Sequence, residues 1–176
     1  MTSLNDANYV KWLLVDAVMD LVAAVDMARE TIAKFDPGAL SKAIGRLRVC
    51  NHSIIISLSK LTEIKEGYSR FFKALPPDVT ANFYRDVAVI ESKNIYLFRN
   101  KHAAHILDRD TKAPISLVRG DELLSTITGK DNSECLNFYD WVYPESWAIE
   151  NECVVSTVVA MRDYCKGLPG GELERP

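Results

Sequence analysis

Apolar residues recur every three or four positions over most of the first seventy residues, which predicts two long amphipathic helices. The first helix is expected over residues 6–35 and the second over residues 39–68. Between them, Asp36-Pro37-Gly38 supplies a tight turn. Polar side chains such as Asp16 and Asp20 fall mostly off the apolar stripe of the first helix, so they are predicted to face water.

The third predicted helix follows a break in the chain and presents two faces. Leu75-Pro76-Pro77-Asp78 interrupts the helical pattern, and Asp78 is a favourable N-cap for a helix that runs from residue 79 to about residue 107. One apolar line should pack into the bundle, while a second line with the same spacing carries Arg99 and His102. A helix with two such faces can meet a partner with the second one.

Residues 108–144 are expected to hold a polar linker followed by an aromatic segment. A short helix is predicted over residues 121–128, closed by Gly129, and a last helix is predicted over residues 145–166. We expect the aromatic segment to cover an open edge of the helical bundle, and a binding surface is the alternative. Its apolar residues are Leu136, Phe138, Tyr139, Trp141, Val142 and Tyr143.

The number and spacing of these helices, with no convincing strand, predict an all-α bundle of four to five helices. The length of 176 residues fits one domain, so residues 1–176 are expected to form a single helical-bundle domain. Apolar residues make up 48% of the chain and charged residues 26%, which is a soluble globular profile. The net charge of −3 gives no global attraction to nucleic acid, so any contact with RNA has to be local.

The sequence indicates a cytoplasmic protein that makes no membrane contact. Residues 1–6 lack the basic start and apolar core of a signal peptide. The most apolar segment, residues 12–27, is too short and too often interrupted by aspartate to span a bilayer. The cysteines are widely spread and form no CxxC, so we expect free thiols in a reducing compartment. They are Cys50, Cys135, Cys153 and Cys165.

One polar residue interrupts the apolar stripe of the second helix. Asn51 stands where the spacing calls for an apolar side chain. We favour an asparagine that is hydrogen-bonded inside the bundle and helps to set its register. A polar group aimed at a shared functional site is the alternative.

The residues best suited to chemistry lie in one short stretch, Arg99-Asn100-Lys101-His102-Ala103-Ala104-His105, which holds two of the three histidines. A guanidinium can clamp a phosphate with paired donors, and an imidazole can move protons near neutral pH. Arg99 and His105 are six residues apart, so on a regular helix they point roughly 120° apart. For both to reach one atom, the helix must end or loosen near His105, or the two side chains must come from different subunits.

This stretch resembles the R-N-x4-H motif of the HEPN superfamily. The segment from Leu97 to Asp108, and Ser57-Leu58-Ser59-Lys60-Leu61 in the preceding helix, are similar to bacterial abortive-infection HEPN proteins in particular. The resemblance implies a HEPN-like helical bundle and a metal-independent endoribonuclease whose site is shared across a homodimer interface. It also implies a toxin or phage-defence effector acting on RNA, with an antitoxin as a further partner and no cofactor.

Carried over to this chain, the resemblance gives catalytic roles to Arg99, Asn100 and His105. The 2′-hydroxyl of RNA is the nucleophile, His105 would take or return a proton, and Arg99 would stabilise charge on the phosphorane. Asn100 matches the polar residue that follows the motif arginine. The expected products are a 2′,3′-cyclic phosphate and a 5′-hydroxyl. The residues expected to contact RNA are Lys101, His102 and Arg109.

Local charge favours the same interpretation. Cations around the motif outnumber anions, and two copies would combine into a basic cleft on an acidic protein. The cations are Lys93, Arg99, Lys101, Arg109 and Lys112, and the anions are Glu91, Asp108 and Asp110.

Other interpretations of the motif remain open. Arg99 could pair only with Glu91 or Asp108, and His102 and His105 could serve as cations at a helix C-terminus. Many HEPN relatives lack activity, so a catalytically inactive HEPN-like binding or scaffold domain is the alternative function. His102 and His105 could also bind one metal ion, with Glu91 or Asp108 adding an oxygen ligand. Because no Glu-x-x-His pairs are available on facing helices, we assign no metal.

Overall fold

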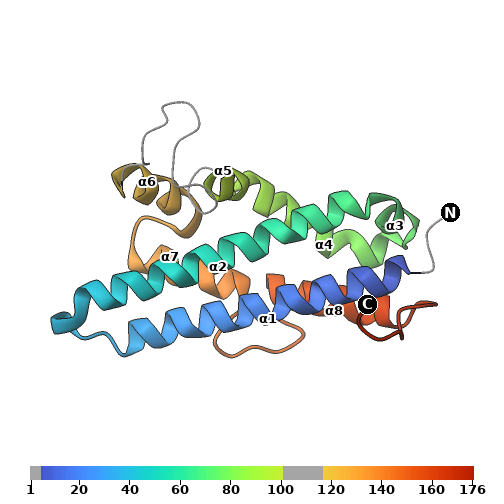
Figure 1. The fold of residues 1–176 in the computed structure, drawn as a ribbon, viewed down its shortest axis with the longest axis horizontal. Coiled ribbons are helices and arrows are strands. Elements are labelled where there is room, and N and C mark those ends of the chain that lie inside the picture. The colour runs from blue at the N-terminus through green and yellow to red at the C-terminus, as the bar shows by residue number, and fades with distance from the viewer. Residues whose placement is uncertain (1–4, 101–116) are drawn as a thin grey trace.

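The protein is an all-α bundle, as its apolar pattern predicts. The computed structural model describes residues 5–100 and 117–176, and these contain helices and no strand. The start of α1 and the C-terminal end of the chain lie at the same end of the molecule (Figure 1). In chain order the elements are α1 (Asp6–Ala33), η1 (Pro37–Ala39), α2 (Leu40–Gly67), α3 (Ser69–Ala74), α4 (Pro77–Ser92), α5 (Ile95–Phe98), α6 (Leu117–Thr128), α7 (Asn132–Val142) and α8 (Val154–Lys166).

The antiparallel pair α1 and α2 runs the length of the molecule (Figure 1). Each helix has 28 residues, which corresponds to about 42 Å. Both predicted helices and the turn between them are confirmed, and the Asp36 carboxylate accepts the N–H of Gly38 at 2.8 Å in that turn. The apolar stripe of α1 is buried against α2 and α8. Its fully buried members are Val10, Leu14, Ala17, Leu21, Val25 and Ala28.

The aromatic part of the core lies where α3 and α4 meet. Phe72 and Phe83 are each 1% exposed, and their rings stack with centroids 5.0 Å apart. The sequence pattern did not predict α3 as a separate helix, because α3 follows α2 after only a short irregularity at Tyr68. The stacked pair joins α3 to α4, and α4 also packs against α2 and α8.

The third predicted helix is not continuous, so the prediction of one helix from residue 79 to residue 107 is wrong. Helix α4 ends at Ser92, and Asn94 adopts the left-handed conformation with φ 58° before α5 begins. Asp78 is also not the N-cap, because the helix starts one residue earlier, at Pro77, where a missing N–H costs nothing. Residues 101–107 lie outside the described residues.

The segment after residue 116 is more helical than its sequence indicated. Helix α6 begins at Leu117, four residues before the predicted start, and ends at Thr128, directly before Gly129, as expected. Gly129 has φ 97°, and an added Cβ there would lie 2.2 Å from the Cβ of Glu134. Helix α7 was not predicted; it is capped by Asp131, whose carboxylate accepts the Glu134 N–H at 2.9 Å. The expected polar linker, residues 108–116, lies outside the described residues.

The aromatic segment covers the bundle, as we favoured. Phe138, Tyr139 and Val142 on α7 are at most 5% exposed and join the core. The last helix, in contrast, begins at Val154 and not at residue 145. The intervening loop is fixed by Trp147, whose indole N–H donates to the Ser156 hydroxyl at 2.9 Å.

All four cysteines are free, and all but the half-buried Cys135 are buried. None of the described helices combines the length and the apolar character needed to cross a bilayer.

Candidate functional site

The short helix α5 carries the first residue of the candidate motif at its end and is anchored by its apolar side. Ile95 and Phe98 are each 1% exposed. The Phe98 ring meets His52 of α2 edge-on, with ring centroids 5.4 Å apart. These contacts hold α5 along α2, so the residue that follows Phe98 has a defined position at the edge of the bundle.

The backbone is irregular on both sides of α5. Asn94 enters the helix in the left-handed region, which few residues other than glycine adopt. Arg99 and Asn100 leave it in π-helical geometry, with a wider turn than an α-helix. Local irregularities of these kinds recur at functional sites in proteins. The break also changes the direction in which Arg99 points relative to the regular helix assumed from the sequence.

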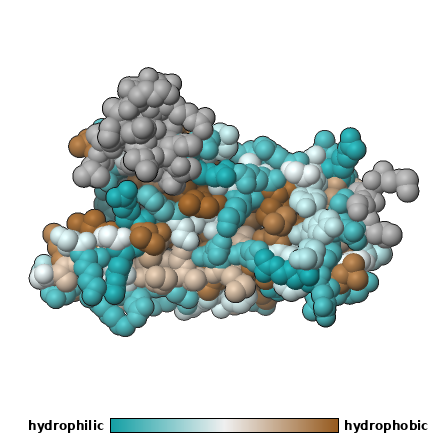
Figure 2. Space-filling view, viewed as in Figure 1, coloured by the Kyte–Doolittle hydropathy of each residue, from teal (hydrophilic) through white to brown (hydrophobic). Residues whose placement is uncertain are grey.

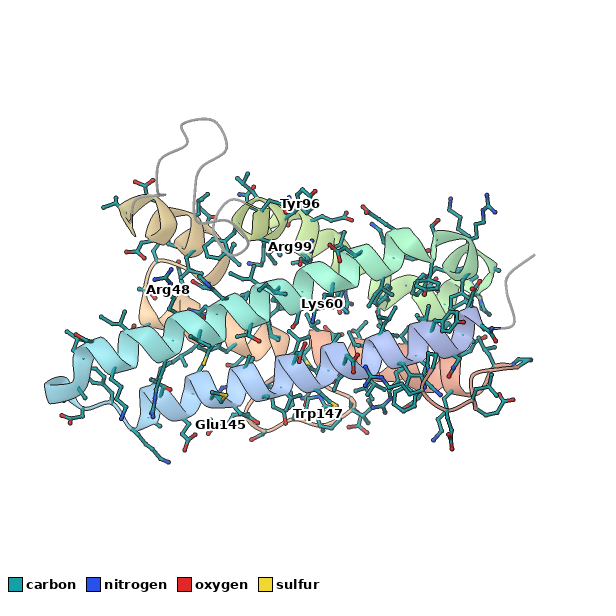
Figure 3. The ribbon with its side chains drawn as sticks, viewed as in Figure 1. Arg48, Lys60, Tyr96, Arg99, Glu145 and Trp147 are labelled. Carbon is teal, nitrogen blue, oxygen red and sulfur yellow. The ribbon has the colours of Figure 1, made fainter. Side chains whose placement is uncertain are left out.

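The Arg99 guanidinium forms an ion pair with Glu63 of α2. The Arg99 side chain is 30% exposed and Glu63 is 49% exposed, so the pair lies at the surface. Figure 3 shows Arg99 on the α2 side of α5, with Tyr96 on its outer side. Glu91, one partner considered from the sequence, is not the residue with which Arg99 pairs, and Asp108, the other, lies outside the described residues. Glu91 instead pairs with Lys65 of α2.

Two further acidic side chains, Glu66 and Glu91, line a cavity together with Glu63. This cavity of about 300 Å³ lies between α2 and the end of α4. Lys93, one of the expected local cations, lies over the Trp141 ring, with its Nζ 5.6 Å from the ring centroid. Among the described residues, the side chains beside Glu63 in this cavity are therefore acidic, whereas Lys101, Arg109 and Lys112, on which the expected basic charge rests, lie outside the described residues.

The structure describes only two of the candidate residues, Arg99 and Asn100. Asn100 is half-buried and adjacent to Arg99. The sequence did not indicate Glu63, because it is 36 residues from Arg99 and only the packing of α5 on α2 brings the two together. The other candidates lie outside the described residues; they are His105, Lys101, His102 and Arg109.

A second polar pair lies within the core. The Tyr139 hydroxyl donates to Oδ1 of Asn51 at 2.8 Å, and both residues are buried. The hydrogen-bonded asparagine that we favoured for position 51 is confirmed. Burial, and then the neighbouring Cys135, raise the pKa of Tyr139, so its phenol stays protonated and keeps its proton to donate.

Within residues 5–100 and 117–176, no three His, Cys, Asp or Glu side chains are grouped so that they could hold a metal ion. His102 and His105, the histidines considered for such a site, are not among these residues.

The comparisons with known proteins bear on the fold. No family model and no curated protein matches the sequence. Among solved structures, the chain is similar to an integron cassette protein from the mobile metagenome of V. paracholerae, with a TM-score of 0.76 and 20% sequence identity. The match covers 90% of this chain and 95% of that chain. At this identity the likeness shows a shared fold alone.

Proposed function

We propose that this chain is a metal-independent endoribonuclease of the HEPN type, acting as a toxin or phage-defence effector. The observation that supports the proposal most is the setting of Arg99. Its guanidinium pairs at the bundle surface with the exposed carboxylate of Glu63, and the backbone is irregular at Asn94, before α5, and again at Arg99 itself. A guanidinium in this setting can exchange its carboxylate for a phosphate at little cost.

The chemistry follows from the substrate. The 2′-oxygen of RNA attacks the adjacent phosphorus, the bond from phosphorus to the 5′-oxygen breaks, and a 2′,3′-cyclic phosphate forms. His105 takes the proton of the 2′-hydroxyl or delivers one to the leaving 5′-oxygen. Arg99 stabilises the negative charge that develops on the phosphorane oxygens. Asn100 orients the motif, and Lys101, His102 and Arg109 contact the RNA backbone.

Glu63 would hold the Arg99 guanidinium in place until a phosphate replaces it. The two side chains are exposed enough for this exchange, since the pair is open to solvent. Because Glu63 competes with phosphate for the same donors, Glu63→Gln should lower the KM for RNA. An increase in KM would contradict this role.

A homodimer would complete the site. Tyr96 is 67% exposed and Leu97 is 37% exposed, and both lie on α5 close to Arg99. Exposed aromatic and aliphatic side chains beside a charged site suit a contact with a second copy, which would bring two motifs together. A protein that sediments as a monomer at all concentrations would contradict a shared site.

The proposal is tested by incubating the purified protein with an RNA oligonucleotide and with DNA of the same sequence, both in excess EDTA. We expect cleavage of the RNA only, because DNA lacks the attacking hydroxyl, and mass spectrometry should find 2′,3′-cyclic phosphate ends. Cleavage that requires a divalent metal, or equal cleavage of DNA, would contradict the proposal.

One observation favours a catalytically inactive HEPN-like binding domain as the second candidate. Arg99 is already paired, and Glu66 and Glu91 lie nearby, which disfavours an approaching RNA backbone. In this case the same α5 surface would bind a protein partner, such as an antitoxin. Such a domain would leave the RNA oligonucleotide intact under all the conditions above.

A further inference from the structure

A cavity of about 490 Å³ lies between the C-terminal end of α1, the beginning of α2, and α7. It is on the opposite part of α2 from the Arg99–Glu63 pair, so it is separate from the candidate nuclease site. Figure 2 shows apolar surface among polar patches at this end of the α1–α2 pair. Three large apolar side chains at the cavity are about half exposed; they are Phe35 at 50%, Leu40 at 52% and Ile44 at 57%.

No charged side chain lines this cavity. Its apolar walls include Leu47 and Leu136, and its polar groups are few. A charged ligand would lose its hydration here without gaining an opposite charge, which makes binding of an ion unfavourable. The composition therefore favours a neutral, largely apolar molecule.

One polar side chain in the lining has hydrogen-bond donors that it does not use within the described residues. Asn51 is only 7% exposed, and its Oδ1 accepts the Tyr139 hydroxyl. Among the described residues this is the one hydrogen bond that the Asn51 side chain makes, so the two N–H groups of Nδ2 are available. A buried amide donor that lines a cavity is a specific point of attachment for an acceptor atom.

We propose that this cavity binds a small neutral organic molecule that carries one hydrogen-bond acceptor, such as a carbonyl oxygen. The acceptor takes the amide N–H of Asn51, and the apolar body of the molecule packs on Phe35, Leu40 and Ile44. The volume is in the range of cavities that hold small ligands, roughly 300–1,000 Å³. This binding site does not depend on nuclease activity at Arg99.

The proposal is tested by titrating two probes into the full-length, ¹⁵N-labelled protein and following amide chemical shifts. The probes are acetophenone and ethylbenzene, which have nearly the same shape but differ in the carbonyl oxygen. We expect saturable shifts around the cavity with both probes, and acetophenone should bind about fivefold more tightly because of one added hydrogen bond. Equal affinities, or shifts scattered over the molecule, would overturn the proposal.

Two matched variants on α2 test whether the probes bind in this cavity. Ala43 lines the cavity, and Ala43→Trp should fill it and abolish the shifts of both probes. Val49 is 65% exposed and does not line the cavity, so Val49→Trp should leave both affinities unchanged. Binding that persists in Ala43→Trp, or is lost equally in Val49→Trp, would contradict the assignment of the site.

Discussion

At the scale of single residues, the sequence showed where a polar group interrupts the core but not what satisfies it. Asn51 stood out because it breaks an apolar stripe. Its partner Tyr139 is 88 residues away, and only the docking of the unpredicted helix α7 brings the two together. The sequence did not indicate Glu63 for the same reason, because only tertiary packing brings it to Arg99. Short-range spacing identifies an unusual residue, whereas its partner is set by tertiary packing.

The hydrogen bond between Tyr139 and Asn51 should stabilise the fold. Tyr139→Phe keeps the ring in the core but leaves Oδ1 of Asn51 buried without a donor, so we expect a loss of about 1–3 kcal/mol in the free energy of unfolding. Urea denaturation measures this loss in the free energy of unfolding. Tyr96→Phe is the matched control at a 67% exposed position and should change stability by less than about 0.5 kcal/mol. Equal effects of the two substitutions would contradict a structural role for this bond.

The buried thiol of Cys165 should make the free energy of unfolding depend on pH in the alkaline range. Burial raises the pKa of Cys165 from about 9 to about 12. Between these values the unfolded chain loses the proton and the folded chain keeps it, so stability falls as pH rises, by up to about 4 kcal/mol. Urea denaturation from pH 9 to 12 should show a shallower fall for Cys165→Ala than for the wild type. Met161→Ala, at another buried position on α8, should lower stability without changing that slope.

At the scale of elements, apolar spacing predicted the long helices well and their interruptions poorly. The stripes of α1 and α2 were sufficient because these helices bury one face along their whole length. The break at Asn94 was missed, since the apolar spacing continues across it into α5. The start of the last helix was misplaced because Pro144 resembles a start signal, whereas Cys153 occupies the N-cap.

The left-handed conformation of Asn94 can be tested directly. Alanine is less favourable than asparagine at φ 58°, so Asn94→Ala should lower the free energy of unfolding by about 1 kcal/mol. Asn94→Gly should leave stability unchanged or slightly raised, because glycine adopts this conformation without strain. Thermal and urea unfolding measure both. A more stable Asn94→Ala variant would show instead that α4 and α5 prefer to form one continuous helix.

At the scale of the whole molecule, the all-α fold was predictable and is shared with an integron cassette protein. A fold of this kind hosts many functions, so the proposed activity rests on the residues of the motif. The sequence shows which residue types the motif contains, and therefore which chemistry they can perform. It could not predict that Arg99 follows a break in the helix, or that it pairs with an acidic residue of α2.

The most direct measurement is the rate of RNA cleavage in EDTA by the wild type, Arg99→Ala and Arg70→Ala. Arg70 is an exposed arginine on α3, away from the candidate site, and serves as the matched control. We predict that Arg99→Ala loses at least about 100-fold in rate, as expected when a group that stabilises transition-state charge is removed, while Arg70→Ala keeps the wild-type rate. Equal rates for all three proteins, or no cleavage by the wild type, would contradict the account.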